Sequence, residues 1–180
     1  MPRAPAVFLD RDGVINRAVI QNGKPYPPQT LAEVEILPGA IWLCEQLAVK
    51  GYLLIGVTNQ PDVARGHQSV EAVEAINDLI LTHLPIKEIL VCYHDDEDNC
   101  DCRKPKPGLI FCAASCYQVN MSSSWMVGDR WKDIAAGMAA GLRTVFVDYN
   151  YNEAYQGPQA DYVVTDVAQA AKIILWKGKK

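Results

Sequence analysis

The chain lacks a long run of apolar residues and an excess of positive charge. No apolar stretch approaches the roughly 18 residues that a membrane-spanning helix needs. The start, MPRAPAVFLDRDG, has no apolar segment of the kind found in secretory signals. With 17 Lys and Arg against 21 Asp and Glu, the net charge of −4 leaves no broad basic surface for nucleic acid. We therefore expect a cytoplasmic protein that binds neither membrane nor nucleic acid.

Internal repeats, low-complexity stretches and Gly- or Pro-rich linkers are also absent from the sequence. The 12 Gly and 11 Pro residues show no periodicity, which excludes collagen-like and extended disordered classes. A length of 180 residues with 49% hydrophobic residues suits one domain with a single core. We therefore treat residues 1–180 as one domain and expect a monomer.

Short apolar runs alternate with stretches of helical periodicity along the chain. Strands are expected at 6–10, 52–59, 88–94, 124–129, 143–148 and 161–166. Helices are expected at 36–51, 69–84 with Ser69 as its N-cap, 107–118 and 133–141, and in a last stretch that ends near residue 176. Strands that are apolar throughout predict an α/β fold, in which helices cover both faces of a parallel sheet.

Ligands of such sheets bind beyond the carboxyl ends of the strands, so the residues that follow each strand are the candidates for a site. Four expected strands are followed by polar residues, in this order: Asp10, Asp12; Thr58, Asn59; a Cys/His cluster with Arg103, Lys104; and Asp129, Asp133. Each group alone is more often a turn, a loop or an acidic helix start, but their combination favours one shared site. Gly13 would permit the sharp turn that aims Asp10 and Asp12 at one centre.

Three carboxylates in one cleft need a cation nearby. Two like charges about 4 Å apart repel by on the order of 4 kcal/mol at an effective dielectric constant near 20, and Mg²⁺ with oxygen ligands removes that cost. Mg²⁺, Lys104 and Thr58 would together bind a dianionic phosphate monoester. In that scheme Asp10 attacks phosphorus and forms an aspartyl phosphate, while Asp12 protonates the leaving alcohol and then activates water.

The segment CYHDDEDNCDCRKPKPG (92–108) contains a clustered set of possible metal ligands. Its members are Cys92, His94, Cys100 and Cys102, and a Cys₃His set is a known structural zinc site. A hard-cation loop built on the acidic run 95–101 is the alternative, but this run lacks the Gly and terminal Glu of an EF-hand. We expect the acidic run to be a solvated loop tip. The remaining cysteines, expected to be buried in helices, are Cys44, Cys112 and Cys116.

Four motifs, FLDRDGVIN, VTNQ, RKPKPG and MVGDRWKD, resemble those of the haloacid dehalogenase superfamily of phosphohydrolases. The resemblance covers residues 6–148. It implies a Rossmann-like three-layer α/β/α fold with a mostly parallel sheet. It also implies that Asp10 is the nucleophile, that Asp12 is the acid/base, and that Mg²⁺ binds Asp10, Asp129 and the Asp12 backbone carbonyl.

The same resemblance suggests roles for the other site residues. Thr58 and Lys104 would stabilise the transferring phosphoryl group, and Asp133 would support the metal site. DRDGxIN and CDCRKPxPG are similar to motifs of the D-glycero-D-manno-heptose-1,7-bisphosphate 7-phosphatases and histidinol-phosphate phosphatases, in which the second motif ends a zinc-bound loop. Here zinc on the loop 92–102 would fix the direction of the adjacent basic residues. The expected substrate-binding residues are Asn59, Arg103 and Arg130.

Several functions remain open at this stage. A heptose bisphosphate is the first candidate substrate, histidinol phosphate the second and another small sugar phosphate the third, because the loop RAVIQNGKPYPPQT (17–30) departs from the Gly-Tyr pair usual in the heptose enzymes. The sequence has little room for a separate cap domain, which argues against a phosphomutase. A catalytically silent, zinc-stabilised binding module is the alternative of another class.

Overall fold

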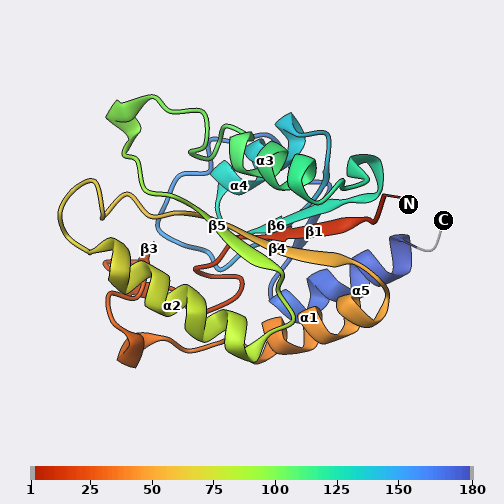
Figure 1. The fold of residues 1–180 in the computed structure, drawn as a ribbon, viewed down its shortest axis with the longest axis horizontal. Helices are drawn as coiled ribbons and strands as arrows, with labels where there is room; N and C mark the ends of the chain where they lie inside the picture. Colours follow the sequence, from red (N-terminus) through yellow and green to blue (C-terminus); the bar gives the residue numbers. More distant parts are fainter. Residues whose placement is uncertain (1–2, 179–180) are drawn as a thin grey trace.

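The centre of the molecule is a six-stranded sheet in which all neighbouring strands are parallel (Figure 1). The computed structural model describes residues 3–178. The strands in spatial order are β5 (Glu88–Cys92), β4 (Leu53–Asn59), β1 (Ala6–Leu9), β6 (Trp125–Gly128), β7 (Arg143–Val147) and β8 (Tyr162–Val164). Each lies within a stretch that the sequence predicts to be a strand, so the expected α/β class with a parallel sheet is confirmed.

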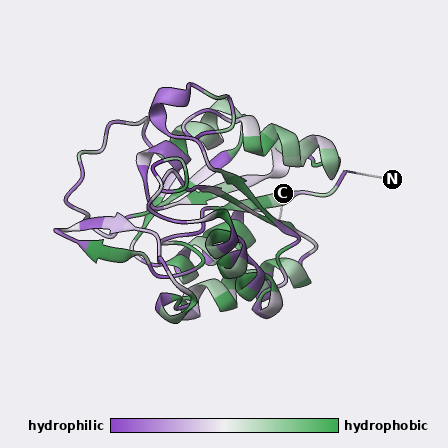
Figure 2. Ribbon diagram, turned by 60° about the vertical axis from the view of Figure 1, so that its left-hand side comes forward, coloured by the Kyte–Doolittle hydropathy of each residue, from purple (hydrophilic) through white to green (hydrophobic). Residues whose placement is uncertain are grey.

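Helices cover both faces of this sheet, as the apolar strands require (Figure 1). On one face lie α1 (Pro38–Val49), α2 (Val70–His83) and α5 (Val167–Lys177). On the other lie α3 (Gly108–Cys116) and α4 (Trp131–Ala139). Alternate residues of β1 point to opposite faces, so Val7 packs in the first layer and Phe8 in the second. Figure 2 shows the hydrophobic residues concentrated in this interior.

A small antiparallel hairpin between β1 and α1 was not predicted. It pairs β2 (Val19–Gln21) with β3 (Lys24–Tyr26). Asn22 and Gly23 form its turn with φ angles of +53° and +76°, the combination that a tight hairpin of the Asn-Gly type needs. The Asn-Gly pair was the available signal. The 3₁₀ turn η1 (Leu31–Glu33) is the other regular element between β1 and α1.

The structure confirms the predicted N-cap of one helix and the burial of one of the three cysteines expected in helices. Ser69 caps α2, because its hydroxyl accepts a hydrogen bond from the Ala72 backbone N–H at 3.2 Å, as predicted. Cys44 is buried as expected, but Cys112 and Cys116 are exposed, so that prediction is wrong. The buried face of α3 is made by other residues, Leu109, Ile110 and Ala113.

In the described part of the chain, no helix has the length and hydropathy needed to cross a membrane. The remaining 3₁₀ turns are η2 (Asp96–Asp98) and η3 (Met121–Ser123).

Candidate functional site

The strand order places three polar side chains side by side at the carboxyl edge of the sheet. β1 lies between β4 and β6, with Leu9 opposite Gly56 on one side and Val127 on the other. Asp10 continues β1, and its backbone N–H donates to the Val127 carbonyl at 3.0 Å. Thr58 near the end of β4 and Asp129 directly after β6 therefore flank Asp10. The predicted convergence of these residues is confirmed by the chain's own topology.

Lys104 reaches the same place from the segment between β5 and α3. Its Nζ donates to Asp10 Oδ1 at 2.6 Å and to the Val57 carbonyl at 2.7 Å. The same Nζ lies 2.6 Å from Asp133 Oδ1. Burial lowers the pKa of Lys104, but the charges of Asp10 and Asp133 outweigh it and raise the pKa, so the amine is positively charged. One buried cation thus contacts two carboxylates.

The carboxylates of Asp10, Asp129 and Asp133 form a compact cluster. One oxygen from each lies within 4.8 Å of the others. Burial, followed by the charge of Asp133, raises the pKa of Asp10 to about 6 despite Lys104. Burial and the charge of Asp10 likewise raise the pKa of Asp129 well above its ordinary value. Lys104 supplies one positive charge for three carboxylates, so the cluster suits a further cation.

Asp129 carries the second observation in favour of a cation. Its Oδ2 accepts a hydrogen bond from the Tyr151 hydroxyl at 2.9 Å, whereas its Oδ1 is buried without a protein hydrogen-bond partner. A buried, unpaired carboxylate oxygen is costly unless something binds it. A hard divalent cation that prefers oxygen ligands, such as Mg²⁺, therefore fits this group. Tyr151 was missed by the sequence analysis, because its position depends on the path of the loop after β7.

The turn after β1 explains the DxDG motif. Gly13 has a φ of +95°, a conformation open mainly to glycine. A Cβ atom at Gly13 would lie 1.8 Å from Asp129 Oδ2, so a side chain has no room here. The turn brings the Asp12 carboxylate into the same cleft as Asp10. There it accepts hydrogen bonds from neighbouring side chains, among them Gln60 at 2.8 Å.

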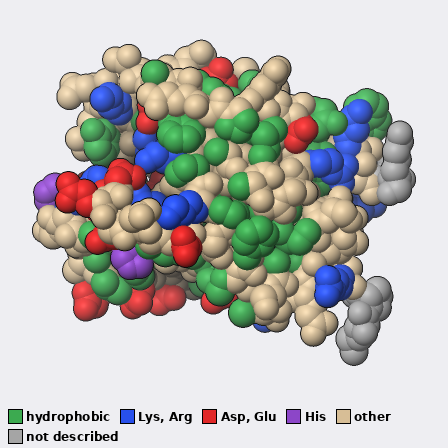
Figure 3. All heavy atoms as spheres, turned by 90° about the horizontal axis from the view of Figure 1, so that it is seen from above, with side chains coloured by type: hydrophobic (Ala, Val, Ile, Leu, Met, Phe, Trp, Pro, Cys, Tyr) green, Lys and Arg blue, Asp and Glu red, His purple; other side chains and the backbone are tan. Residues whose placement is uncertain are grey.

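A cavity of about 230 Å³ opens above Asp10. Asp10, Asp12, Thr58 and Lys104 line its floor, and the hairpin residues 24–27 line one wall. Figure 3 shows acidic and basic side chains gathered at this end of the molecule, where Figure 1 places the carboxyl ends of the strands. The cavity wall also includes the basic residues Lys24, Arg65, Arg103, Arg130 and Lys132.

The three residues expected to bind substrate differ in their surroundings. Asn59 holds the backbone of Lys104, donating to its carbonyl at 3.0 Å and accepting from its N–H at 3.1 Å. Arg130 pairs with Glu153, because its Nε donates to one carboxylate oxygen at 2.9 Å and its Nη2 donates to the other. Arg103 donates to Asp96 at 2.8 Å and to the His94 carbonyl at 3.1 Å. All three line the cavity, but Asn59 uses its amide to position Lys104.

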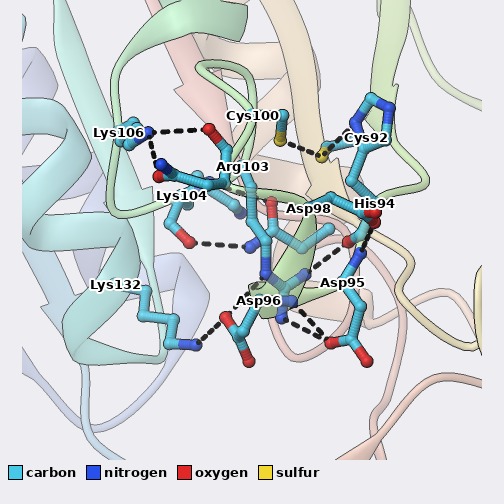
Figure 4. Close-up of polar contacts among 12 residues, drawn as sticks. Cys92, His94, Asp95, Asp96, Asp98, Cys100, Arg103, Lys104, Lys106 and Lys132 are labelled. Atoms are coloured by element: carbon cyan, nitrogen blue, oxygen red, sulfur yellow. Dashed lines mark hydrogen bonds and ion pairs between the residues drawn. The ribbon is translucent and has the colours of Figure 1, made fainter.

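The acidic run is largely exposed, as expected of a solvated loop tip, but Asp95 is partly buried, and both Asp95 and Asp96 form ion pairs. Asp96 contacts Arg103 and also Lys132, the latter at 3.4 Å (Figure 4). Asp95 pairs with Arg65 at 2.6 Å. These carboxylates neutralise cations at the cavity mouth, although the Asp96 side chain remains 63% exposed. Of the acidic run, Asp96 therefore belongs to the wall of the site.

The Cys/His cluster has the dimensions of a tetrahedral metal site. Bonds of about 2.1–2.3 Å to Zn²⁺ would separate neighbouring ligand atoms by about 3.5–3.8 Å. The Sγ atom of Cys92 lies 3.7 Å from that of Cys100 and 3.2 Å from that of Cys102. His94 Nδ1 lies 3.7 Å from Cys92 Sγ and 3.3 Å from Cys102 Sγ. Three thiols and one imidazole at these separations fit Zn²⁺.

The chain is similar to known proteins over most of its length. Residues 101–170 match the HAD-hydrolase-like family model. The D-glycero-β-D-manno-heptose-1,7-bisphosphate 7-phosphatase of Pseudomonas putida is 32% identical over 94% of this chain and 98% of its own. The enzyme of the same name from Pasteurella multocida is 34% identical over 97% of this chain and 98% of its own.

The chain belongs to the haloacid dehalogenase-like phosphatases. As a member, it is a phosphoric monoester hydrolase. A crystal structure of the D,D-heptose 1,7-bisphosphate phosphatase from B. bronchiseptica, complexed with magnesium and phosphate, superposes with a TM-score of 0.81 at 26% identity. That match covers 96% of this phosphatase and 99% of the other chain. Phosphatases of this family use Mg²⁺, which agrees with the cation preference deduced from the carboxylate cluster.

Proposed function

We propose that this phosphatase hydrolyses a small sugar phosphate, with D-glycero-D-manno-heptose 1,7-bisphosphate as the first candidate and its 7-phosphate as the group removed. The observation that carries the proposal is the buried contact between Lys104 and Asp10, placed beside two further carboxylates at the floor of a cavity. Near full-length similarity to two heptose bisphosphate phosphatases supports the choice of substrate.

In the proposed reaction an Asp10 carboxylate oxygen attacks phosphorus while the bond from phosphorus to the alcohol oxygen breaks. The carboxyl group of Asp12 gives its proton to that departing oxygen, and the alcohol leaves. Asp12 then takes a proton from water, whose oxygen attacks phosphorus and breaks the bond to Asp10. Inorganic phosphate leaves, Asp10 is again a carboxylate, and Asp12 is again protonated.

Lys104 and Thr58 would stabilise the transferring phosphoryl group, because both line the cavity floor beside Asp10. Asp10 and Asp129, with the Asp12 backbone carbonyl, would hold Mg²⁺, and Asp133 would support them. Bound Mg²⁺ supplies positive charge that offsets the repulsion between a carboxylate and a dianionic phosphate. Asp133 also fixes the turn into α4, since its Oδ2 accepts from the Arg130 backbone N–H at 3.0 Å.

We further assign Zn²⁺ to the Cys/His cluster as a structural ion. The loop 92–102 has few apolar side chains, and it carries the carbonyl and carboxylate that hold Arg103. Cross-linking this loop would keep Arg103 and the adjoining Lys104 in place, and small displacements of catalytic charge are costly. The cations at the cavity mouth, including Arg103 and Arg130, would bind the part of the substrate that does not react.

Assembly and location are inferred from the same features. We propose that the chain acts as one domain and as a monomer, because the residues assigned to catalysis all come from this chain. A cytoplasmic location is proposed, since reduced thiols are needed to bind zinc.

The test is phosphate release from a panel of esters in the presence of Mg²⁺: both anomers of heptose 1,7-bisphosphate, fructose 1,6-bisphosphate and histidinol phosphate. The highest kcat/KM is expected for a heptose bisphosphate, with activity lost in Asp10→Asn. A preference for histidinol phosphate would overturn the choice of substrate and leave the chemistry intact. Absence of Asp10-dependent phosphate release from every ester would favour a catalytically silent binding module.

A further inference from the structure

Gln60 is a buried polar residue to which the reaction scheme gives no task. It directly follows β4, and its side chain has no exposed surface. Its amide Nε2 donates to Asp12 Oδ2 at 2.8 Å and to Thr58 Oγ1 at 2.8 Å. Its backbone N–H donates to the Cys92 carbonyl at 2.7 Å, which fixes the residue against the end of β5. One amide nitrogen therefore joins the proposed acid/base to the proposed phosphate-binding hydroxyl.

The orientation of this amide is imposed by its partners. Gln60 Oε1 is buried without a hydrogen-bond partner. Rotating the amide by half a turn would place Oε1 against Asp12 Oδ2, and two acceptors repel there whenever Asp12 is ionised. An unpaired buried carbonyl oxygen costs stability, so packing alone would favour an apolar residue at this position. The unpaired oxygen indicates that the bonds made by Nε2 have a functional value.

The hydroxyl of Thr58 is oriented by the same contact. Because Gln60 donates to Thr58 Oγ1, the hydroxyl hydrogen must point elsewhere. Thr58 lines the cavity beside Asp10, so its hydrogen is free to be donated to a phosphate oxygen there. Gln60 thus prepares Thr58 as a donor.

Asp12 is held by four hydrogen bonds, and at Oδ2 the bond from Gln60 is the one made by a neutral donor. Arg11 donates to both carboxylate oxygens, at 3.1 and 3.0 Å, and Asn16 donates to Oδ1 at 3.0 Å. Arg11 is charged, fully buried and itself anchored by Asn77 at 3.0 Å. Gln60 is the neutral donor to Oδ2, so its bond is easier to release than the Arg11 ion pair when that oxygen carries or transfers a proton.

We propose that Gln60 is a positioning residue that aims the Asp12 carboxyl group at the leaving oxygen and couples it to phosphate binding at Thr58. The inference rests on the proposed function, because it assumes that Asp12 protonates the leaving alcohol. Its distinctive consequence concerns the leaving group. A poor leaving group, such as a sugar alkoxide, needs the proton from Asp12, whereas p-nitrophenolate leaves without it.

The experiment compares kcat/KM for p-nitrophenyl phosphate with kcat/KM for the alkyl phosphate that reacts best in the ester panel. This parameter covers the steps up to departure of the leaving group, so hydrolysis of the aspartyl phosphate does not obscure it. Gln60→Met keeps the length of the side chain and removes both hydrogen bonds. We expect the ratio of alkyl to aryl kcat/KM to fall about tenfold, the value of one hydrogen bond.

Three further variants serve as comparisons for the ratio measured in Gln60→Met. Asp12→Asn is expected to lower the same ratio by about 10²–10⁴, whereas Thr58→Val should weaken both esters and leave the ratio unchanged. Gln68→Leu is the matched structural control, because Gln68 is also a buried glutamine, and its amide donates to the Pro28 carbonyl at 3.0 Å instead. It should leave the ratio unchanged even where stability falls.

The outcomes separate the two proposals. An unchanged ratio in Gln60→Met, in a protein whose Asp12→Asn variant shows the leaving-group effect, overturns the role of Gln60 alone. If Asp12→Asn leaves the ratio of alkyl to aryl kcat/KM unchanged, the proposed function is overturned instead. The same follows if neither ester shows Asp10-dependent hydrolysis. Gln60→Leu provides a second folded variant, and its melting temperature is measured beside that of Gln68→Leu.

Discussion

Lys104 Nζ lies 2.6 Å from Asp10 Oδ1, although 94 residues separate the two along the chain. The same nitrogen lies 2.6 Å from Asp133 Oδ1, and the side chain of Lys104 is only 4% exposed. A single buried ammonium group therefore links the proposed nucleophile to the carboxylate cluster. Because Asn59 binds both the N–H and the carbonyl of Lys104, the position of this charge is set by β4 as well as by the loop 92–102.

Replacing Lys104 by Met should lower kcat by about 10²–10³, because a preorganised cation beside the transferring phosphoryl group is lost. It should also lower the free energy of unfolding by about 3–5 kcal/mol, since two buried carboxylates lose their partner. Steady-state kinetics and urea unfolding measure both effects. Lys106→Met is the control, because Lys106 is a neighbour whose side chain is 43% exposed and contacts Asn99. Equal activity of the two variants would contradict the role of Lys104.

Stability without metal should depend on pH through Asp10 and Asp129. The pKa of Asp10 rises from 3.8 to about 6 on folding, mainly through burial. A raised carboxyl pKa contributes stability that is fully present below 3.8 and is lost as pH rises through about 6. The metal-free protein should therefore melt lower at pH about 7.5 than at pH about 5.

Mg²⁺ should raise the melting temperature more at the higher of these pH values, because it binds the ionised carboxylates. Scanning calorimetry with and without Mg²⁺ measures this. The same scans on Asp129→Asn separate the cluster from other titrating groups, such as Asp95, whose pKa is lowered to about 2 by its hydrogen bond with Arg65. A Mg²⁺ effect that is independent of pH, or one that survives in Asp129→Asn, would count against the assigned ligands.

Removing one ligand of the Cys/His cluster should lower activity without altering Asp10. Cys100→Ser is expected to lose zinc, to melt at a lower temperature and to lose at least about tenfold in activity, because the loop that holds Arg103 is released. Metal analysis together with kinetics measures this. Cys112→Ser is the matched control, since Cys112 is exposed on α3 outside the cluster. Full activity in protein shown to be free of zinc would refute the structural role of the ion.

Gly13→Ala should weaken metal binding. A Cβ atom there would lie 1.8 Å from Asp129 Oδ2, and the φ of +95° adds strain. Gly51→Ala separates the two effects, because Gly51 has a φ of +81° with nothing within 4 Å of the added atom. Both variants should lose about 1–2 kcal/mol of stability from strain. Only Gly13→Ala should weaken Mg²⁺ binding, by about tenfold or more in titration calorimetry. Similar Mg²⁺ affinity in both would contradict this placement.

Several site residues could be predicted because their position depends only on where the apolar strands end. Each of Asp10, Thr58 and Asp129 lies at or directly after the end of an apolar strand, and parallel strands share one carboxyl edge. The hairpin 19–26 was missed although its Asn-Gly turn was visible, because three-residue strands give little periodicity. Cys112 and Cys116 were misplaced because α3 is apolar on most sides, so the sequence does not show which stripe faces the sheet.

The sequence by itself determined the helices and the strands of the parallel sheet, though not the short hairpin, together with the types and the order of the polar side chains at the strand ends, since these depend on side-chain chemistry and periodicity. Tertiary structure alone decided which loops meet above Asp10. It brought about the hydrogen bonds of Tyr151 with Asp129, of Arg103 with Asp96, and of Gln60 with both Asp12 and Thr58. Such contacts join residues that are far apart in the chain, or residues that the backbone turns toward each other at the end of a strand. Their geometry follows from strand order and packing, which no local sequence pattern encodes.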